Sequence, residues 1–434
     1  MAHHIIWDGW SFDLLYTDLA ELYSAQLESR EPRLPELPVS YGDFAAWHNQ
    51  WAQGPDYMRQ LAVWRERLEL DNRSGGPQPL PTDKPRRPGM SGRGASHGIT
   101  VEKDLTEALH AAGLRIDATI FMVLLTAYFV LLHQSTGHRE LIVGTPVRGR
   151  DREEFEGVMG YFTNLLPLYL RLDPSRPFAD AVRQVKGVVL DSFANPDVRL
   201  EHLARDLSLR NTSGGAVLYQ SLFSFQDIRQ RVVRWGNVRH QRMAYFQPGA
   251  TEDLGQWFAE DDSGLLGGML YNTDIFHQHT THTLCERYMT LLRAIAADPW
   301  QTVEALSQVD DGRPRLIGTE HQPARAASAK AALPGPPSQI EDPRVRYLLD
   351  LWGEVLGVPV TPEDNFFEVG GHSMVGVEMA ARVTRDCGVR LNLVQLASQS
   401  LEQIAEALPK TVSAGGASEG LSSRMLGKVR RLFG

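Results

Sequence analysis

A proline-rich stretch near the end of the sequence divides the chain into two parts that must fold separately. Residues 311–343, DGRPRLIGTEHQPARAASAKAALPGPPSQIEDP, contain six prolines and many alanines. This composition favours a flexible linker with an end-to-end distance on the order of 30 Å. We therefore expect a large unit before the linker, a compact helical unit over 344–410, and a Gly/Ser/Ala-rich tail over 411–434.

Composition excludes several classes of protein. A net charge of −9 over 434 residues argues against nucleic acid as the main partner. The two cysteines, Cys285 and Cys387, lie far apart and are predicted to be free thiols in a reducing compartment. The longest apolar run (119–132) is shorter than the roughly 20 residues that span a bilayer, so we predict a buried helix, no membrane span and a cytoplasmic location.

The large unit alternates helical and strand-like patterns. Apolar residues recur at helical spacing over 105–115 and 119–133, and strand-like runs cover 141–147, 166–172, 218–226 and 264–272. This alternation predicts an α/β fold with a covered sheet. Nearer the N-terminus, a Gly/Pro/Arg-rich connector begins at about residue 71, and the helical pattern before it is predicted to start with Ser11 as N-cap.

The small unit carries a serine with a definite chemical meaning. Helical patterns cover 345–356, 373–387 and 400–408, and Gly370 and Gly371 come shortly before Ser373. Glycines leave the backbone open there, so a phosphate on the serine would meet a helix N-terminus. The segment DNFFEVGGHS resembles the attachment segment of acyl and peptidyl carrier domains, which are small all-α four-helix units. The resemblance implies that Ser373 carries 4′-phosphopantetheine.

The first residues of the chain pair two histidines with an Asp-Gly, in HHIIWDG (3–9). On a strand, adjacent side chains point in opposite directions, which disfavours a shared metal ion. The cluster His277, His279 and His282 is predicted to be a solvated loop or helix start, so we predict no metal site. A buried pair of core histidines stays open as an alternative. The other interpretation is catalytic, because an imidazole can act as a base or hold an amine near neutral pH.

The stretch HHIIWDGWS resembles the HHxxxDG motif of nonribosomal peptide synthetase condensation domains, members of the chloramphenicol acetyltransferase-like superfamily. Further segments resemble this family's motifs in the family's order: YGDFAAW (41–47), LPTDKPRRP, IVGTPVRGRDREEFEGVMGYFTNLLPL (142–168), LYQSLFSFQD and LYNTDIF (270–276). The resemblance implies a condensation domain over 1–310. Within it, 1–70 would end a first lobe, 71–98 would be a connector, and 99–310 would form a full second lobe.

The resemblance also implies roles for individual residues. His4 would be catalytic, and Gly9 would place backbone near the reacting carbonyl. Asp8 would be structural and pair with Arg150, because a buried carboxylate needs a partner. His3 would be structural and Asn164 would line the substrate channel. Two departures from the family pattern, SFANPDVRLEHL in place of HQxxPFExL and Thr163 in place of Val, leave the substrate class open.

The implied reaction is amide formation between an upstream acyl or peptidyl thioester and an aminoacyl thioester on a carrier. The implied partners are an upstream carrier protein, an adenylation enzyme acting in trans and a phosphopantetheinyl transferase. A downstream synthetase could dock on an amphipathic helix predicted at 421–434. Two alternatives stay open: a non-catalytic recruiting domain, and a related ester-forming or epimerising acyltransferase.

The position of the HHIIWDG motif raises a further expectation. Residues 3–70 would supply only the last strand end and the helices of the first lobe, so we expect a longer protein or a partner to provide the rest. In the isolated chain, residues 3–70 should then be loosely held and condensation should be undetectable.

Overall fold

A computed structural model describes residues 3–72, 80–86, 91–150, 152–206, 218–229, 231, 234–239, 249–307, 342–356, 360–366, 369, 373–389, 391, 395–396 and 399–409. The chain divides into two compact units, one over Met1–Leu209 and Ser213–His321 and the other over Arg210–Thr212 and Gln322–Gly434. The predicted linker, apart from residues 342 and 343, and the predicted tail helix lie outside the described residues.

The large unit is built on a six-stranded mixed sheet with the strand order β1-β8-β7-β4-β2-β3. The pairs β7–β4 and β4–β2 are parallel, and the other neighbours are antiparallel. The strands of this sheet are β1 (Gly94–Glu102), β2 (Glu140–Val147), β3 (Asn164–Arg171), β4 (Ser221–Asp227), β7 (Leu254–Asp261) and β8 (Gly264–Asn272); a separate hairpin pairs β5 (Arg234–Trp235) with β6 (Val238–Arg239).

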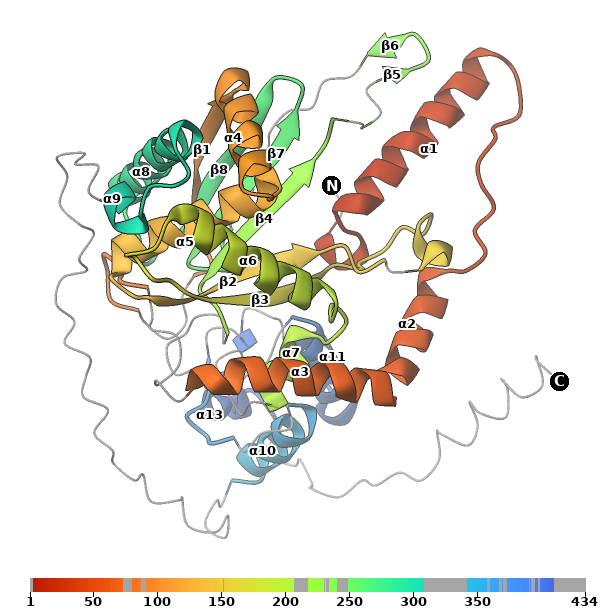
Figure 1. Ribbon diagram of the computed structural model, residues 1–434. Coiled ribbons are helices and arrows are strands. Elements are labelled where there is room, and N and C mark those ends of the chain that lie inside the picture. Colours follow the sequence, from red (N-terminus) through yellow and green to blue (C-terminus); the bar gives the residue numbers. More distant parts are fainter. Residues whose placement is uncertain are drawn as a thin grey trace. The chain divides into compact units, whose positions relative to one another are not determined.

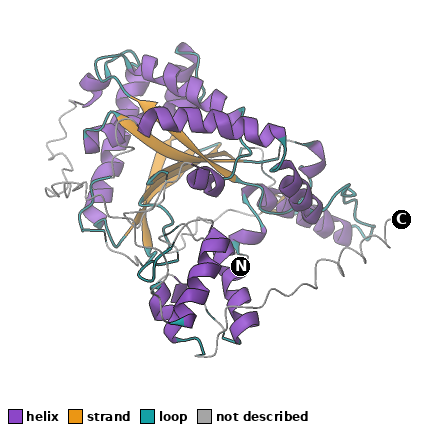
Figure 2. Ribbon diagram, turned by 90° about the horizontal axis from the view of Figure 1, so that it is seen from below, coloured by secondary structure: helices purple, strands orange, loops and turns teal. Residues whose placement is uncertain are grey.

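A layer of helices packs along one face of the sheet, as the α/β pattern predicts (Figures 1 and 2). The core lies between this layer and the strands. Thr119 caps the most buried helix through a hydrogen bond from the Met122 N–H, and Gly137 ends it with a φ of 74°. The helices of the layer are α4 (Lys103–Arg115), α5 (Ile120–Thr136), α6 (Phe178–Phe193) and α8 (Gln278–Ala297).

The remaining elements of the large unit include those that carry the motifs at its N-terminal end. They are the 3-10 helices η1 (His4–Ile6) and η2 (Glu153–Phe155) and the α-helices α1 (Gly9–Leu27), α2 (Tyr41–Trp51), α3 (Pro55–Asn72), α7 (Leu200–Asp206) and α9 (Val303–Ser307).

Helix α3, within the residues expected to be loosely held, packs against the core of the large unit. Tyr57, Leu61, Trp64 and Leu68 are buried in the same hydrophobic core as the sheet. The Trp64 indole N–H also donates to the carbonyl of Asn195, at 2.9 Å. The apolar side chains of α3 therefore pack on the core of the large unit. How firmly residues 3–70 are held in the isolated chain, and their assignment to a first lobe, stay predictions.

The four predicted strands are present in the large sheet, and two further strands of this sheet, β1 and β7, were not predicted, nor was the hairpin of β5 and β6. Strand β8 has the predicted bounds, 264–272, and β2, β3 and β4 differ by one to three residues at their ends. Strand β1 lies partly inside the predicted connector, where Gly94 and Gly98 weaken the strand pattern. Strand β7 contains Asp261 and Glu260, whose charges mask its apolar character in the sequence.

Within the described residues, no single helix is both long and apolar enough to cross a bilayer. Only α4 and α5 taken together reach the required length and hydropathy, and the two helices meet at an angle of 96°.

The small unit has its own hydrophobic core. Trp352 and Phe366 are fully buried there, with ring centroids 5.1 Å apart in an edge-to-face contact. Ser400 caps the last helix and forms a capping box with Gln403. The helices described in this unit are α10 (Pro343–Leu356), α11 (Ser373–Cys387) and α13 (Leu401–Glu406), which match the predicted helices to within two residues at each end.

Candidate functional site

His3 and His4 begin a short 3-10 helix, where the sequence suggested a strand end. The His3 ring nitrogen Nδ1 accepts a hydrogen bond from the Ile5 N–H at 3.1 Å, which caps η1. His4 is exposed, and its ring lies edge-on to Tyr161 with centroids 5.4 Å apart. The alternative of a buried pair of core histidines is therefore wrong, because both side chains are exposed.

Asp8, and not Ser11, is the N-cap of α1. The Asp8 carboxylate accepts from the Ser11 N–H at 3.0 Å, and Ser11 completes a capping box three residues into the helix. Both residue types are good N-caps and they are three positions apart, so the sequence alone does not distinguish them. The cap orients the short segment that carries His4.

Asp8 and Arg150 form the ion pair that the family resemblance implies. The Arg150 Nη1 lies 2.6 Å from the Asp8 Oδ2, and both side chains are almost completely buried. Burial by itself would raise the pKa of Asp8, but hydrogen bonds from Arg150, Ser11 and Phe162 and the guanidinium charge outweigh burial. The pKa of Asp8 is therefore lowered, and the carboxylate stays ionised at neutral pH.

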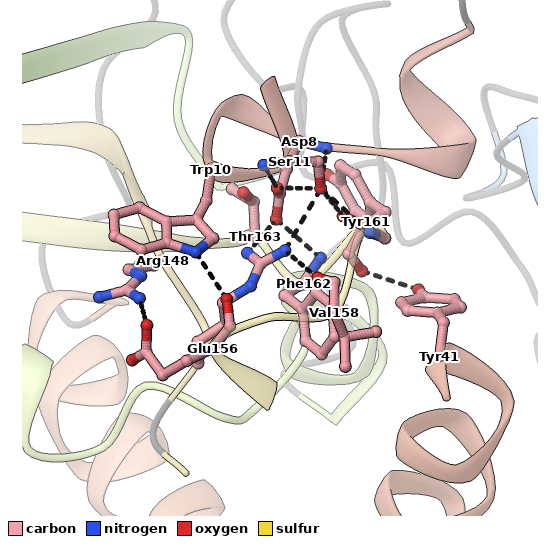
Figure 3. Close-up of polar contacts among 12 residues, drawn as sticks. Asp8, Trp10, Ser11, Tyr41, Arg148, Glu156, Val158, Tyr161, Phe162 and Thr163 are labelled. Carbon is pink, nitrogen blue, oxygen red and sulfur yellow. Dashed lines mark hydrogen bonds and ion pairs between the residues drawn. The ribbon is translucent and has the colours of Figure 1, made fainter. Parts of the chain in front are cut away.

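The Ser11 hydroxyl joins this ion pair to the segment 158–162 (Figure 3). It lies 2.9 Å from both the Asp8 Oδ1 and the Gly160 carbonyl, to either of which it can donate. It accepts from the Gly160 N–H at 3.0 Å and from the Arg150 Nη2 at 3.3 Å. Sequence reasoning missed this function of Ser11, because the contact with Gly160 exists only in the tertiary structure.

Three of the sequence motifs meet around Tyr161. The Tyr41 hydroxyl from YGDFAAW donates to the Tyr161 carbonyl at 2.7 Å, and the Tyr161 ring contacts His4. Strand β4 approaches as well: a Cβ added to Gly9 would lie 3.6 Å from the Gln226 Nε2. Segments distant in sequence thus converge on the HHIIWDG motif and position it.

Asn164 has a structural role in addition to the predicted place in the substrate channel. Its side chain is 6% exposed, and its Nδ2 donates to the carbonyls of Pro196 and Val198 at 2.7 and 2.8 Å. The amide therefore holds the loop that precedes α7. A contact of Asn164 with substrate stays a prediction.

Alanine substitutions at two glycines of this site, Gly9 and Gly160, are expected to have different effects on stability. Gly160→Ala should lower the free energy of unfolding by about 1–3 kcal/mol, because the added Cβ would overlap the Tyr41 ring. Gly9→Ala should leave stability close to wild type, since its Cβ would meet an ordinary contact. Urea denaturation measures both variants; a Gly9→Ala protein as unstable as Gly160→Ala would contradict the geometry. Any loss of activity in a stable Gly9→Ala protein would then reflect substrate approach.

Ser373 lies in the small unit, at the first position of the 15-residue helix α11. A phosphate attached there would meet the positive end of the helix, so this position fits a phosphodiester-linked group. Gly370, Gly371 and the side chain of Ser373 lie outside the described part of the structure.

Comparisons with known proteins agree with this arrangement. The family model "Condensation domain" matches residues 1–317, and "Phosphopantetheine attachment site" matches residues 346–408. Phosphinothricin tripeptide synthetase of Streptomyces viridochromogenes is 33% identical over 307 residues, which are 70% of this chain and 28% of that protein. Gramicidin S synthase 2 of Brevibacillus brevis is 28% identical over 430 residues, 96% of this chain and 9% of that protein.

The fold is similar to solved condensation domains. The first condensation domain of the CDA synthetase matches with a TM-score of 0.60 and 26% identity, covering 70% of this chain and 65% of the solved chain. The present chain thus spans a small fraction of the length of its curated relatives. It belongs to the condensation-domain family of nonribosomal peptide synthetases, a family of amide-forming acyltransferases, and continues into a carrier domain for covalently bound 4′-phosphopantetheine.

Proposed function

We propose that the large unit joins an upstream acyl or peptidyl thioester to an aminoacyl thioester, and that the carrier is loaded by a separate adenylation enzyme. The observation that carries the proposal is the exposed His4, four residues before an Asp8 that is held in a buried ion pair with Arg150. The phosphopantetheine arms, when bound, present the two thioesters. His4 orients or deprotonates the attacking amine.

The surrounding residues act by positioning. Asp8 and Ser11 fix the start of α1, and Arg150, through the Val158 carbonyl, fixes the segment before β3 to the same point. We expect most of the rate gain to come from holding two tethered reactants together, since well-oriented reactions gain about 7–11 kcal/mol in this way. A rigid frame around His4 is what such positioning requires.

A single-turnover assay tests the proposal. One carrier is loaded with an acyl group and the carrier of this chain with an aminoacyl group, and intact mass follows the acyl chain. If another polypeptide supplies the predicted first lobe, product forms only when that polypeptide is added. An amide-linked chain, held as a thioester on the phosphopantetheine arm of Ser373, supports the proposal. Binding of both carriers without transfer would instead favour the recruiting alternative, and an ester product or an inverted stereocentre would favour the related acyltransferases.

The attachment residue has its own expected result. Ser373→Ala should gain no phosphopantetheine mass when treated with coenzyme A and a phosphopantetheinyl transferase, because the nucleophilic hydroxyl is gone. Ser400→Ala is the matched control: it loses an N-cap bond to the Gln403 N–H, worth about 1 kcal/mol, but keeps Ser373. Intact-mass measurement decides. An adduct on the Ser373→Ala protein would refute the assignment.

A further inference from the structure

Two histidines far apart in the sequence meet at the edge of the large sheet. His97 belongs to β1, the edge strand, and His282 belongs to α8, which packs beside it. The His282 Nδ1 lies 3.2 Å from the His97 Nε2, and the two rings are roughly perpendicular at 70°. One nitrogen of each ring therefore faces the other ring at hydrogen-bond distance.

The 3.2 Å separation of the two nitrogens also fits two ligands on one metal ion. Imidazole nitrogens bind zinc at about 2.0–2.1 Å, so two of them on a tetrahedral ion lie ~3.3 Å apart. The His282 side chain is 50% exposed, which leaves an ion access from solvent. No group of three or more potential protein ligands occurs among the described residues, so water would complete the coordination.

A carboxylate next to the other nitrogen of the His282 ring also fits a metal site. Glu286, one helical turn after His282, places its Oε1 3.4 Å from the His282 Nε2. Metal-binding histidines commonly donate their second N–H to a carboxylate, which fixes the tautomer that leaves the other nitrogen free for the ion. The tautomer with a proton on Nε2 would leave the His282 Nδ1 available.

We propose that His97 and His282 bind a borderline divalent cation such as Zn²⁺, with Glu286 as the outer partner of His282. Nitrogen ligands favour Zn²⁺, Ni²⁺ and Cu²⁺ over Mg²⁺, which prefers oxygen. The ion joins the edge strand β1 to α8 and stabilises the folded state, because it binds that state selectively. The site is separate from His3 and His4.

Titration calorimetry on the full chain, freed of metal with a chelator, tests the site. We expect saturable Zn²⁺ binding by the wild type in the titration. In thermal denaturation, the Tm should rise with Zn²⁺. Mg²⁺ should produce neither effect. His97→Ala and His282→Ala should each remove this one site. Glu286→Gln should weaken it by roughly tenfold or more.

A second histidine pair provides the matched control. His277 and His279 stack with ring centroids 5.4 Å apart, and replacing both with Ala should leave the Zn²⁺ isotherm unchanged. Three results would overturn the proposal: no saturable Zn²⁺ binding, binding that persists undiminished in both His97→Ala and His282→Ala, or loss of binding in the control variant. In the first case the two rings share only an N–H···N hydrogen bond.

Discussion

Arg150→Met is expected to lower the free energy of unfolding of the large unit by about 3–5 kcal/mol, the usual cost of leaving one member of a buried ion pair without its partner. The Asp8 and Arg150 side chains are 1% and 0% exposed, so water cannot replace the lost guanidinium. The substitution also removes the bonds from Arg150 to Ser11 and to the Val158 carbonyl. Urea denaturation followed by tryptophan fluorescence measures the change.

Arg148→Met is the matched control. Arg148 pairs with Glu156, and both side chains are 41% exposed; its guanidinium also stacks on Trp10 at 3.5 Å from the ring centroid. An exposed ion pair and an exposed cation–π contact together contribute no more than about 2 kcal/mol. Equal losses in Arg148→Met and Arg150→Met would contradict the central place given to the buried pair.

The same ion pair makes the free energy of unfolding depend on pH in the acid range. The pKa of Asp8 is lowered in the folded protein, so the carboxylate adds stability above its ordinary pKa of 3.8. That contribution is lost as the pH falls through the lower folded pKa. In Arg150→Met the main stabilising partner of the carboxylate is gone, so the stability lost between neutral pH and the acid range should be smaller than in wild type.

Much of the fold could be predicted from local sequence patterns. Strand β8 and helix α11 have the predicted bounds because turn residues and apolar spacing mark both of their ends. The α5 helix could be predicted because Thr119 and Gly137 are strong local start and stop signals. Strand β1 could not, because Gly94 and Gly98 lower its strand propensity and its pairing with β8 decides its structure.

The candidate site could be predicted only in part. The Asp8–Arg150 pair follows from the resemblance to a family, since nothing local links two residues 142 positions apart. The Ser11 contact with Gly160 and the His97 contact with His282 depend on how separate elements pack, and no periodicity in the sequence contains that information. The α3 helix shows the same limit, because its burial against the loop at Asn195 is a tertiary effect.

His4→Ala is expected to reduce single-turnover condensation by roughly 10²–10⁴-fold, the range over which a positioned acid–base group contributes. Folding should be unaffected, because His4 is exposed and its ring contact with Tyr161 is an edge contact at the surface. Loading of Ser373 should also be unaffected, since it depends on the small unit. The assay is the two-carrier reaction, with the mass of the loaded carrier as an internal check.

The neighbouring histidine separates chemistry from local structure. His3→Ala removes the hydrogen bond from the Ile5 N–H that caps η1, and so tests whether the shape of this turn alone accounts for a loss of rate. We expect His3→Ala to stay within several-fold of wild type, because Asp8, Ser11 and Arg150 hold the segment from its other end. If His3→Ala lost as much activity as His4→Ala, both histidines would act by holding the shape of η1, and His4 would have no separate chemical role. If His4→Ala turned over at the wild-type rate, His4 would not be the catalytic base. Another group, or the positioning of the two thioesters alone, would then account for the reaction.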